Sequence, residues 1–385
     1  MSLAICVICY NRIAPLKRVL KSLEAAHYDA PIPLIISIDK SETTAIEDFV
    51  EAYHWPHGTL KAIKHPHNLG LRAHVLEVGK LLNDYDALIV LEDDITVSPY
   101  YYQYACQTIA QYQDDERIAG ISLYSFPVNY QNGLPFTPLQ ADADVYFMNC
   151  AQSWGQIWLK KQWQTFMIWY ETHHDEFQLD YLPQALNDWP KSSWLKYHTR
   201  YCIEENKYFV YPYQALSSNN NDAGTHVEQE ETNIFASSLQ VLPQKAYRLP
   251  AFDEGIVKYD GFFSPTFLAH YLQLSEDDLT VDFWGKRKLQ HVKRYLLTTR
   301  SLPFKVVNSF GLRYHPMETN IMLQEKGQEI YLYDTHTKGK KPKAIKPITL
   351  LQYSYRFKIL SLLKAVGIAN LVMMVCKRWC KKLIK

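Results

Sequence analysis

The sequence predicts an α/β protein with a mostly parallel sheet flanked by helices and a C-terminal extension. Three observations point to this fold class. Apolar segments of strand length alternate with segments of helical apolar spacing through the first hundred residues. Such alternation joins parallel strands by helical crossovers, which cover both faces of the sheet. The chain has 385 residues, of which 47% are hydrophobic, and this is enough for a sizeable core.

Four strands and three helices are expected in this first part. The strands are short apolar runs at residues 3–11, 33–39, 59–65 and 87–92. The helices are expected at residues 14–26, 44–54 and 71–82. In the first helix, Pro15 lies near the start, and Leu16, Val19 and Leu20 share one face.

Polar residues follow each of the four predicted strands. The groups are Tyr10-Asn11-Arg12, Asp39-Lys40-Ser41, residues 65–68 and Glu92-Asp93-Asp94. Ligands of parallel α/β sheets bind beyond the carboxyl ends of the strands, so these groups are expected to line one edge. The three adjacent acids repel one another, and a positive partner would stabilise them.

The acidic triplet and the absence of an early glycine indicate the kind of ligand. No glycine precedes Gly58, which excludes a glycine-rich phosphate loop after the first strand and disfavours a dinucleotide or a P-loop nucleotide. A divalent cation on Asp93 and Asp94 would hold phosphates in another way. The alternative is a solvated turn that caps the helix beginning near Pro99.

An ordered set of motifs resembles glycosyltransferases of the type A fold. The motifs are "VICYNR" with "PLKRVLKSL", "ISIDKS", "HNLGLRAHV", "LIVLEDDITVSPYYYQY", "SWGQIWLKKQW" and "YFVYPYQALSSNNNDAGTH". They cover roughly Met1 to His226 and are similar to family-2-like bacterial enzymes and the N-acetylglucosaminyltransferase I group. The resemblance implies a nucleotide-binding sheet and transfer of a hexosyl or N-acetylhexosaminyl group from a nucleotide sugar, with uridine diphosphate as the carrier and inversion at the sugar.

The resemblance also implies roles for individual residues. The base and ribose of the donor would be held by residues that follow the first two strands, namely Tyr10, Asn11, Arg12 and Asp39. The acidic triplet would bind Mn²⁺ or Mg²⁺ at the diphosphate, chiefly through Asp94 with Asp93 and Glu92 in support. Trp154 and Gly155 would shape the pocket for the donor sugar and the acceptor.

The chemistry of sugar transfer suggests further residues. Negative charge grows on the leaving diphosphate, so a nearby basic side chain would stabilise it, and Arg72 or Lys40 is suited to this. An inverting enzyme also needs a carboxylate that takes the proton of the acceptor hydroxyl. The resemblance implies an acid just after Trp194, where this chain has none, and Asp188 becomes the candidate base. Other acids in this half are Asp180, Glu204 and Asp222.

Two features of the second half of this region have alternative explanations. Six of the nine tryptophans lie between Trp154 and Trp194, and aromatic rings stack well on sugars. Trp154 and Trp158, however, are four residues apart on a predicted helix, which is also core spacing; Gly155 makes Trp154 the best candidate for substrate contact. His226 is a candidate metal ligand, with a hydrogen-bonded structural histidine as the alternative.

The chain divides into three predicted parts. Residues 1–227 would form the catalytic domain, with a nucleotide-binding half (1–98) and a half for the donor sugar and acceptor (99–227). Residues 228–335 would form an accessory region, in which residues 279–297 are expected to be a strand leading into a helix. Residues 336–385 would be a mobile basic linker and an amphipathic tail.

The charges predict an anionic partner for this tail. Residues 335–385 contain 13 Lys or Arg and no Asp or Glu, while residues 1–334 contain the other 28 basic and all 40 acidic side chains. We expect the tail to bind an anionic membrane surface rather than nucleic acid. Scattered cysteines and an N-terminus unlike a secretory signal favour a cytoplasmic protein, placed peripherally at the inner face of the cell membrane.

Three functions are compatible with these features. The preferred one is a metal-dependent glycosyltransferase that acts on a glycan or lipid-linked acceptor in surface polysaccharide biosynthesis. A nucleotidyltransferase would also combine a nucleotide fold with acidic metal ligands, but it would normally show a glycine-rich phosphate loop. A non-catalytic, transferase-like scaffold that binds glycan or partner proteins is the third.

Overall fold

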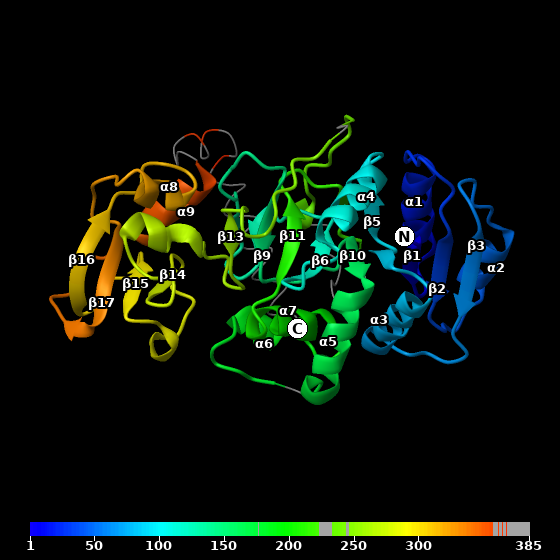
Figure 1. The fold of residues 1–385 in the computed structure, drawn as a ribbon, viewed down its shortest axis with the longest axis horizontal. Coiled ribbons are helices and arrows are strands. Elements are labelled where there is room, and N and C mark those ends of the chain that lie inside the picture. The colour runs from blue at the N-terminus through cyan, green and yellow to red at the C-terminus, as the bar shows by residue number, and fades with distance from the viewer. Residues whose placement is uncertain are drawn as a thin grey trace.

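The computed structural model is an elongated α/β protein whose centre is a nine-stranded sheet (Figure 1). It describes residues 1–175, 177–222, 233–243 and 246–356, together with residues 361, 364 and 367. Within this part of the chain the strand order is β13-β9-β11-β6-β10-β4-β1-β2-β3. Five of the eight neighbouring pairs are parallel, which confirms the prediction of a mostly parallel sheet.

The alternating strands and helices of the first hundred residues are confirmed. The strands are β1 (Leu3–Cys9), β2 (Leu34–Ile38), β3 (Leu60–Lys64) and β4 (Ala87–Glu92), and the helices are α1 (Ile13–Glu24), α2 (Ala45–Ala52) and α3 (Leu71–Gly79). Alternate strand residues face opposite sides. Ile5 and Val7 pack in the core with α1 and α2, whereas Ala4 and Cys6 pack on the side of α3.

The sheet continues with strands from the second half of the chain. They are β6 (Ile118–Ser122), β9 (Val145–Met148), β10 (Gln156–Leu159), β11 (Tyr208–Pro212) and β13 (Lys258–Tyr259). Helix α4 (Tyr101–Tyr112) packs on the side of α1, and α5 (Lys160–His173) and α7 (Leu195–Glu204) pack on the side of α3. Short elements complete this region: β5 (Ile95–Val97) paired with β12 (Ser217–Asn219), β7 (Val128–Asn129) paired with β8 (Leu134–Pro135), and α6 (Gln184–Asp188).

The prediction of a helix through Trp154 and Trp158 is wrong. Residues Gln156–Leu159 form β10, which lies antiparallel between β4 and β6. Gly155 has a φ of +94°, which no right-handed helix accommodates. Trp158 is 1% exposed and stacks on Trp163, with ring centroids 3.9 Å apart, so this tryptophan belongs to the core.

A second sheet of four strands forms the end of the molecule farthest from β3 (Figure 1). It contains β14 (Leu279–Asp282), β15 (Tyr295–Thr298), β16 (Phe304–Phe310) and β17 (Ile330–Lys338), in the order β14-β15-β17-β16, with α8 (Met317–Met322) beside it. The expected strand at residue 279 is confirmed, but the expected helix after it is wrong. Residues Tyr295–Thr298 instead pair with β14 and β17, and this pairing outweighs local helical propensity.

The two sheets share one continuous hydrophobic core. Tyr146 of the central sheet and Leu332 of the second sheet belong to the same buried cluster. The proposed boundary at residue 227 stays a prediction, and the central sheet takes β13 from beyond it. After β17 the chain forms α9 (Pro347–Tyr355). None of the helices in the described part of the chain is long and apolar enough to cross a bilayer.

Candidate functional site

The carboxyl ends of β1, β2 and β4 meet at one edge of the central sheet. Ile8 near the end of β1 pairs with Glu92 at the end of β4, and β2 runs parallel beside β1. Strand β10 runs the opposite way, so its first residue, Gln156, pairs with Val90. The segment before β10, which contains Trp154, therefore enters the edge at which the acidic triplet lies.

Arg12 is the positive partner of the acidic triplet. Its Nε donates to Asp93 Oδ2 at 3.3 Å, and its Nη2 donates to Asp94 Oδ2 at 3.2 Å and to Asp93 Oδ1. Asp93 is 4% exposed, so this ion pair is shielded from bulk water. A guanidinium has the planar fork that suits two carboxylate oxygens at once, and it holds the turn after β4 against the end of β1.

Burial raises the pKa of each carboxyl group in the triplet, and repulsion within the triplet adds to the shift for Glu92 and Asp93. For Glu92, burial is the largest cause of the raised pKa, followed by the charges of Asp94 and Asp93. Burial raises the pKa of Asp93 to about 6, although Arg12 opposes the shift. Burial likewise raises the pKa of Asp94. One guanidinium thus does not offset the effect of burial, and the three carboxyl groups release their protons less readily than free acids do.

The triplet fits a hard cation that shares its shell with a substrate. Among the described residues, no group of three or more His, Cys, Asp or Glu side chains is arranged to hold a metal ion. Asp94 Oδ1, however, is a buried carboxylate oxygen without a hydrogen-bond partner in this part of the chain. Mg²⁺ is often bound by one or two carboxylates, with water and substrate phosphates as its other ligands, and one free carboxylate oxygen fits that donor set.

A strand pair from a distant segment lies against the triplet. Asn220 follows β12, which pairs with β5, and its backbone N–H and Nδ2 donate to the Asp94 carbonyl at 3.0 and 2.8 Å. Asp222 forms an ion pair with Arg18, and its charge, after burial, contributes to the raised pKa of Asp93 and Asp94. The polar run "SSNNND" is the sequence signal for these residues, and it indicates an ordinary surface turn equally well.

The predicted nucleotide residues differ in their accessibility. Asp39 is buried, and its carboxylate accepts hydrogen bonds from the backbone N–H groups of Leu69 at 2.8 Å and Gly70 at 3.0 Å. It therefore fixes the start of α3 against the end of β2. Tyr10 and Asn11 are exposed at the end of β1, with 38% of Tyr10 accessible, so a ligand at this edge can reach them.

The two basic candidates for phosphate contact bind other groups. Arg72 Nη1 donates to the Tyr197 hydroxyl at 3.0 Å, and its guanidinium lies over that ring, 5.3 Å from the centroid. Lys40 Nζ donates to Glu47 Oε1 at 2.9 Å. Arg12 is instead the cation that the structure brings to the carboxylates.

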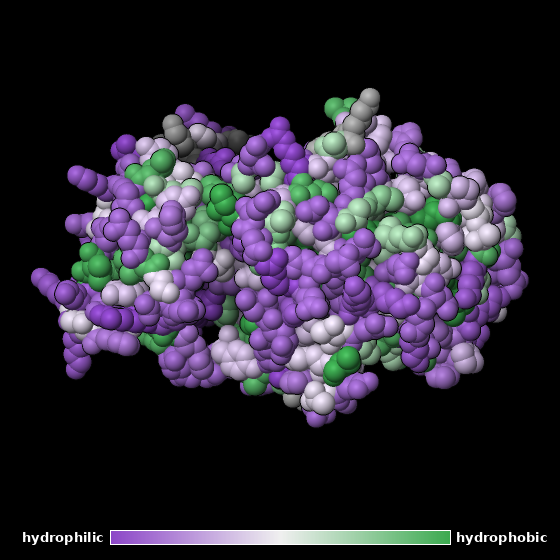
Figure 2. Space-filling view, in the orientation of Figure 1, coloured by the Kyte–Doolittle hydropathy of each residue, from purple (hydrophilic) through white to green (hydrophobic). Residues whose placement is uncertain are grey.

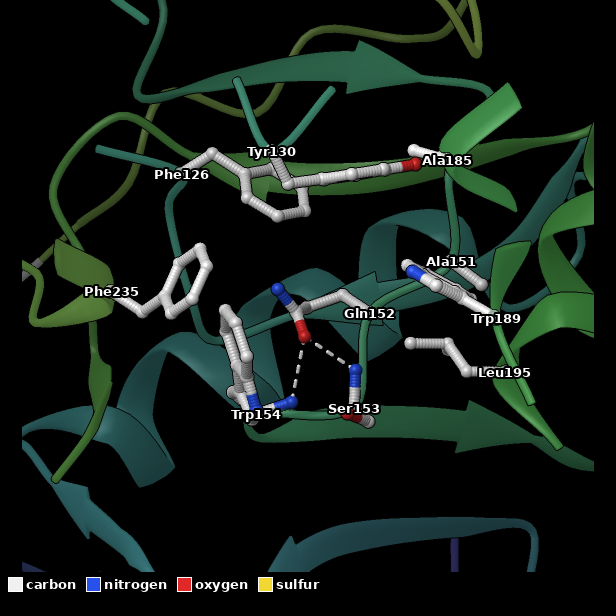
Figure 3. A pocket seen from close by; sticks show the side chains of 10 residues that line it. All are labelled: Phe126, Tyr130, Ala151, Gln152, Ser153, Trp154, Ala185, Trp189, Leu195 and Phe235. Atoms are coloured by element: carbon white, nitrogen blue, oxygen red, sulfur yellow. Dashed lines mark hydrogen bonds between the residues drawn. The ribbon is translucent and has the colours of Figure 1, made fainter. Parts of the chain in front are cut away.

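A cavity of about 330 Å³ lies at the segment that leads into β10 (Figure 3). Its lining residue Ser153 brings it near the triplet, because the side chain of Ser153 is close enough to Glu92 to oppose the rise in the pKa of that carboxyl. Among the residues that the structure describes, half of those lining the walls are aromatic and none is Lys, Arg, Asp or Glu. The lining residues are Phe126, Tyr130, Ala151, Gln152, Ser153, Trp154, Ala185, Trp189, Leu195 and Phe235.

Gln152 places a hydrogen-bond donor among these rings. Its side chain is 2% exposed, and its Oε1 accepts from the backbone N–H groups of Ser153 at 2.5 Å and Trp154 at 2.7 Å. Figure 3 shows the amide nitrogen turned away from these bonds and towards the aromatic side chains. The cavity therefore presents a fixed N–H donor inside apolar walls, which suits an uncharged ring with an oxygen acceptor.

Trp154 and Gly155 are positioned by β12. Ser217 Oγ donates to the Trp154 carbonyl at 2.6 Å. A Cβ atom at residue 155 would lie 2.7 Å from Ser217 Oγ, and its φ of +94° also requires glycine. The Trp154 ring lies against Phe235, with centroids 4.9 Å apart, at the wall of the cavity.

The structure places the candidate base outside the cavity lining. Asp188 is exposed and its Oδ1 accepts from Gln184 Nε2 at 2.7 Å, although the next residue, Trp189, lines the cavity. Of the alternative acids, Asp222 is the one whose charge acts on the triplet. His226, the predicted further metal ligand, lies outside the described residues.

Compared with models of known protein families and with curated proteins, the sequence matches none. Among solved structures, part of the chain is similar to residues 1–349 of S. aureus TarS in complex with UDP-GlcNAc, with 14% identity, 59% of this chain and 60% of that chain covered, and a TM-score of 0.38. It is also similar to the mannosyltransferase PcManGT from Pyrobaculum calidifontis in complex with GDP-Man and Mn²⁺, with 10% identity, coverage of 55% and 54%, and a TM-score of 0.35. It is similar as well to GalNAc-T7 with UDP, GalNAc and Mn²⁺, with 11% identity, 55% of this chain and 43% of that chain covered, and a TM-score of 0.36. Less than two thirds of each of these chains is matched.

Proposed function

We propose that this protein is a metal-dependent glycosyltransferase that moves an uncharged sugar from a nucleotide sugar to an acceptor. One observation carries the proposal. A buried acidic triplet at the carboxyl edge of a parallel sheet retains a free carboxylate oxygen, and Ser153 links it to an aromatic cavity with a single fixed amide donor. A diphosphate at the triplet would place its sugar at the mouth of this cavity.

Residues of the sheet edge would bind the nucleotide. Tyr10 and Asn11 are exposed where β1 ends and would contact the base, while Asp39 keeps the neighbouring loop in place. Asp94, with Asp93, would hold Mn²⁺ or Mg²⁺, which when bound supplies positive charge next to the leaving diphosphate. Arg12 would orient both carboxylates through its fork of N–H groups.

The cavity would bind the sugar. Trp154 and Phe235 offer ring faces for stacking, and Gln152 offers an N–H group to a sugar oxygen. The proton of the acceptor hydroxyl would pass to a carboxylate, for which Asp188 and Asp222 are the candidates. Asp188→Asn and Asp222→Asn would separate them, because only loss of the base lowers transfer without weakening binding of the nucleotide.

The finer features of the proposal rest on the resemblance of the sequence motifs. They are a uridine diphosphate carrier, inversion at the sugar, and a glycan or lipid-linked acceptor in surface polysaccharide biosynthesis. A peripheral position at the inner face of the cell membrane would bring the enzyme to such an acceptor.

Calorimetry with uridine diphosphate, with and without Mn²⁺, tests this function. We expect binding that requires Mn²⁺ and falls about 100-fold in Asp94→Asn, because a carboxylate ligand is replaced by a neutral amide of the same shape. Asp84→Asn is the matched control, since Asp84 is an exposed acid before β4. Equal affinity in both variants would contradict the assignment of the metal site.

A non-catalytic scaffold is the second candidate, because Arg12 already neutralises much of the triplet. In that case Arg12 and the acids would serve only to join β1 to β4. The same calorimetry would then show no binding of nucleotide diphosphate at any Mn²⁺ concentration, and a donor screen would show no hydrolysis of a nucleotide sugar.

A further inference from the structure

The two ends of the molecule carry opposite charge. Residues 279–346, which contain the second sheet, have 14 Lys or Arg and 5 Asp or Glu. Residues 1–278 have 19 basic and 35 acidic side chains. Six of the lysines at the C-terminal end are exposed and close together in the chain or on neighbouring strands, and we call them the lysine row: Lys305, Lys338, Lys340, Lys341, Lys343 and Lys346.

The lysine row is held against the second sheet rather than on a free linker. The backbone N–H of Gly339 donates to the Pro303 carbonyl at 3.1 Å. Ser301 Oγ donates to the Pro342 carbonyl at 2.5 Å. The single proton of the Tyr331 hydroxyl is shared between the carbonyls of Gln328 at 2.6 Å and Lys343 at 2.9 Å. The backbone of the predicted basic linker is therefore hydrogen-bonded to the second sheet at Gly339 and Pro342, and its mobility stays a prediction.

Glycine at residue 339 permits this close approach. A Cβ atom there would lie 2.5 Å from the Phe304 carbonyl oxygen and 2.7 Å from the Cα of Lys305. Strand β16 and the segment after β17 thus lie in direct contact: Phe304 pairs with Lys338, and Gly339 lies against the backbone of Phe304 and Lys305.

None of the six lysines forms an ion pair in the part of the chain that the structure describes. Three arginines of the same region form ion pairs: Arg287 with Asp260, Arg294 with Asp334 and Arg313 with Glu325. Lysines on an edge strand can also prevent pairing with other sheets. That explanation covers Lys305 of the edge strand β16, but not Lys338, which ends the inner strand β17, nor the lysines from residue 340 to 346, which lie outside strands.

Exposed aliphatic side chains flank the lysine row. Val306 and Val307 follow Lys305 on the edge strand, and 50% of Val307 is accessible. Ile348 and Leu351, in the helix that follows Lys346, are exposed as well. In Figure 2, apolar and polar side chains lie side by side at the end of the molecule formed by β16 and β17.

We propose that the lysine row, with Val306 and Val307 and the start of α9, is a docking surface for an anionic lipid bilayer. Lysines near an anionic membrane are attracted to its lipid head groups, and adjacent aliphatic groups enter the head-group boundary. A soluble polyanion such as RNA fits less well, because the exposed side chains that follow Lys305 and Lys346 are aliphatic, whereas aromatic groups are the ones that stack on bases. This folded surface is separate from the amphipathic tail predicted from the sequence.

Vesicle binding by the full-length protein tests the proposal. The probes are vesicles of phosphatidylcholine alone and of phosphatidylcholine mixed with phosphatidylglycerol, and the measurement is the partition coefficient by flotation. The row variant replaces Lys338, Lys340, Lys341 and Lys343 by Glu. We expect the wild type to bind only the anionic vesicles, and the row variant to bind them at least about tenfold more weakly.

A matched control keeps the tail and the change in net charge constant. It replaces four exposed lysines outside this region by Glu: Lys21, Lys61, Lys80 and Lys161. It is expected to bind close to wild type. The variant Val306→Ser with Val307→Ser keeps all charges, and it is expected to lose binding that persists at high salt.

Three outcomes would overturn the proposal. One is equal binding by the row variant and the control, which would leave membrane attachment to the tail alone. Another is loss of RNA binding with no change in vesicle binding. The third is self-association of the row variant, measured by light scattering, with unchanged vesicle binding, which would assign the lysines to protection of the sheet edge.

Discussion

At the scale of single residues, Arg12 provides the positive charge that pairs with the carboxylates of the acidic triplet. It lies three residues beyond the end of β1, and the resemblance assigns it to the nucleotide. In the structure its guanidinium binds both Asp93 and Asp94. Its position after the strand could be predicted, but its partner could not, because the direction of a long flexible side chain depends on the strand that pairs next to its own.

Arg12→Ala is expected to lower the free energy of unfolding by about 3 kcal/mol, because it leaves buried acids without their cation. Arg12→Lys should lower the free energy of unfolding by less, since lysine keeps the positive charge but lacks the planar guanidinium that binds both carboxylates. If the triplet binds metal, Mn²⁺ should restore part of the stability of Arg12→Ala. Chemical denaturation with and without Mn²⁺ measures this, and a wild-type midpoint in Arg12→Ala would show that the ion pair contributes nothing.

A second buried acid lies where the two sheets join. Glu318 of α8 accepts a hydrogen bond from the Tyr259 hydroxyl of β13. Burial raises the pKa of Glu318 to about 7 from an ordinary value of 4.5, although the bond from Tyr259 opposes this. The folded protein therefore keeps a proton at this site at pH values where the unfolded chain has lost it.

This proton makes stability depend on pH. Between pH 4.5 and 7 the native state binds more protons than the unfolded state, so the free energy of unfolding falls as pH rises. The loss attributable to Glu318 is about 3 kcal/mol, since one pKa unit corresponds to about 1.4 kcal/mol. Glu318→Gln keeps the oxygen that accepts from Tyr259 and should remove this loss. Urea denaturation at pH 5 and pH 8 compares the two proteins, and parallel profiles would contradict the assignment.

At the scale of secondary-structure elements, the first strands could be predicted because burial leaves a clear pattern. Strands β1, β2 and β4 are buried on both faces and read as continuous apolar runs. Strand β13 has two residues, too few for any periodicity. Strand β10 follows Gly155, and its Trp158 comes four residues after Trp154. Tryptophans four residues apart also fit one face of a helix, so apolar periodicity alone predicts a helix here.

The site could be predicted in part, because several of its residues follow these recognisable strands. The polar residues at the ends of β1, β2 and β4 are adjacent because parallel strands end at one edge. Gln152, Asn220 and Phe235 reach the site from loops and from the pairing of β12 with β5. Sequence pattern indicates that a segment is a strand, but it does not indicate which distant strand it pairs with.

Two tryptophans four residues apart should behave differently when replaced by alanine. Trp158 of β10 is buried against Trp163, so Trp158→Ala should lower the free energy of unfolding by about 3–5 kcal/mol. Trp154 lies at the wall of the cavity, so Trp154→Ala should cost less stability and chiefly weaken sugar transfer. Thermal unfolding and transfer kinetics on both variants measure the difference. Equal losses of stability would place Trp154 in the core.

At the scale of the whole molecule, the shared core opposes a division into independent domains. Buried residues of the central and second sheets form one cluster, and Tyr259 and Glu318 join the two by a buried hydrogen bond. The resemblance that reaches only to residue 226 gives no sign of this, because the packing partners of the central sheet lie beyond the motifs.

We therefore expect the full chain to unfold in a single cooperative transition. Intrinsic tryptophan fluorescence reports mainly on residues 154–194, and far-ultraviolet circular dichroism reports on both sheets. The two signals should change at the same temperature. Two separate transitions would show that the second sheet unfolds on its own.

The unequal distribution of charge has one more consequence. A body with 16 excess negative charges and an end with 9 excess positive charges form a large electric dipole. Near a negatively charged layer such a dipole experiences a torque, which turns the positive end inward before any contact is made. Molecules that approach in random orientations would thus reach the layer with the positive end first. Raising the ionic strength would screen the dipole and lower the rate of this association.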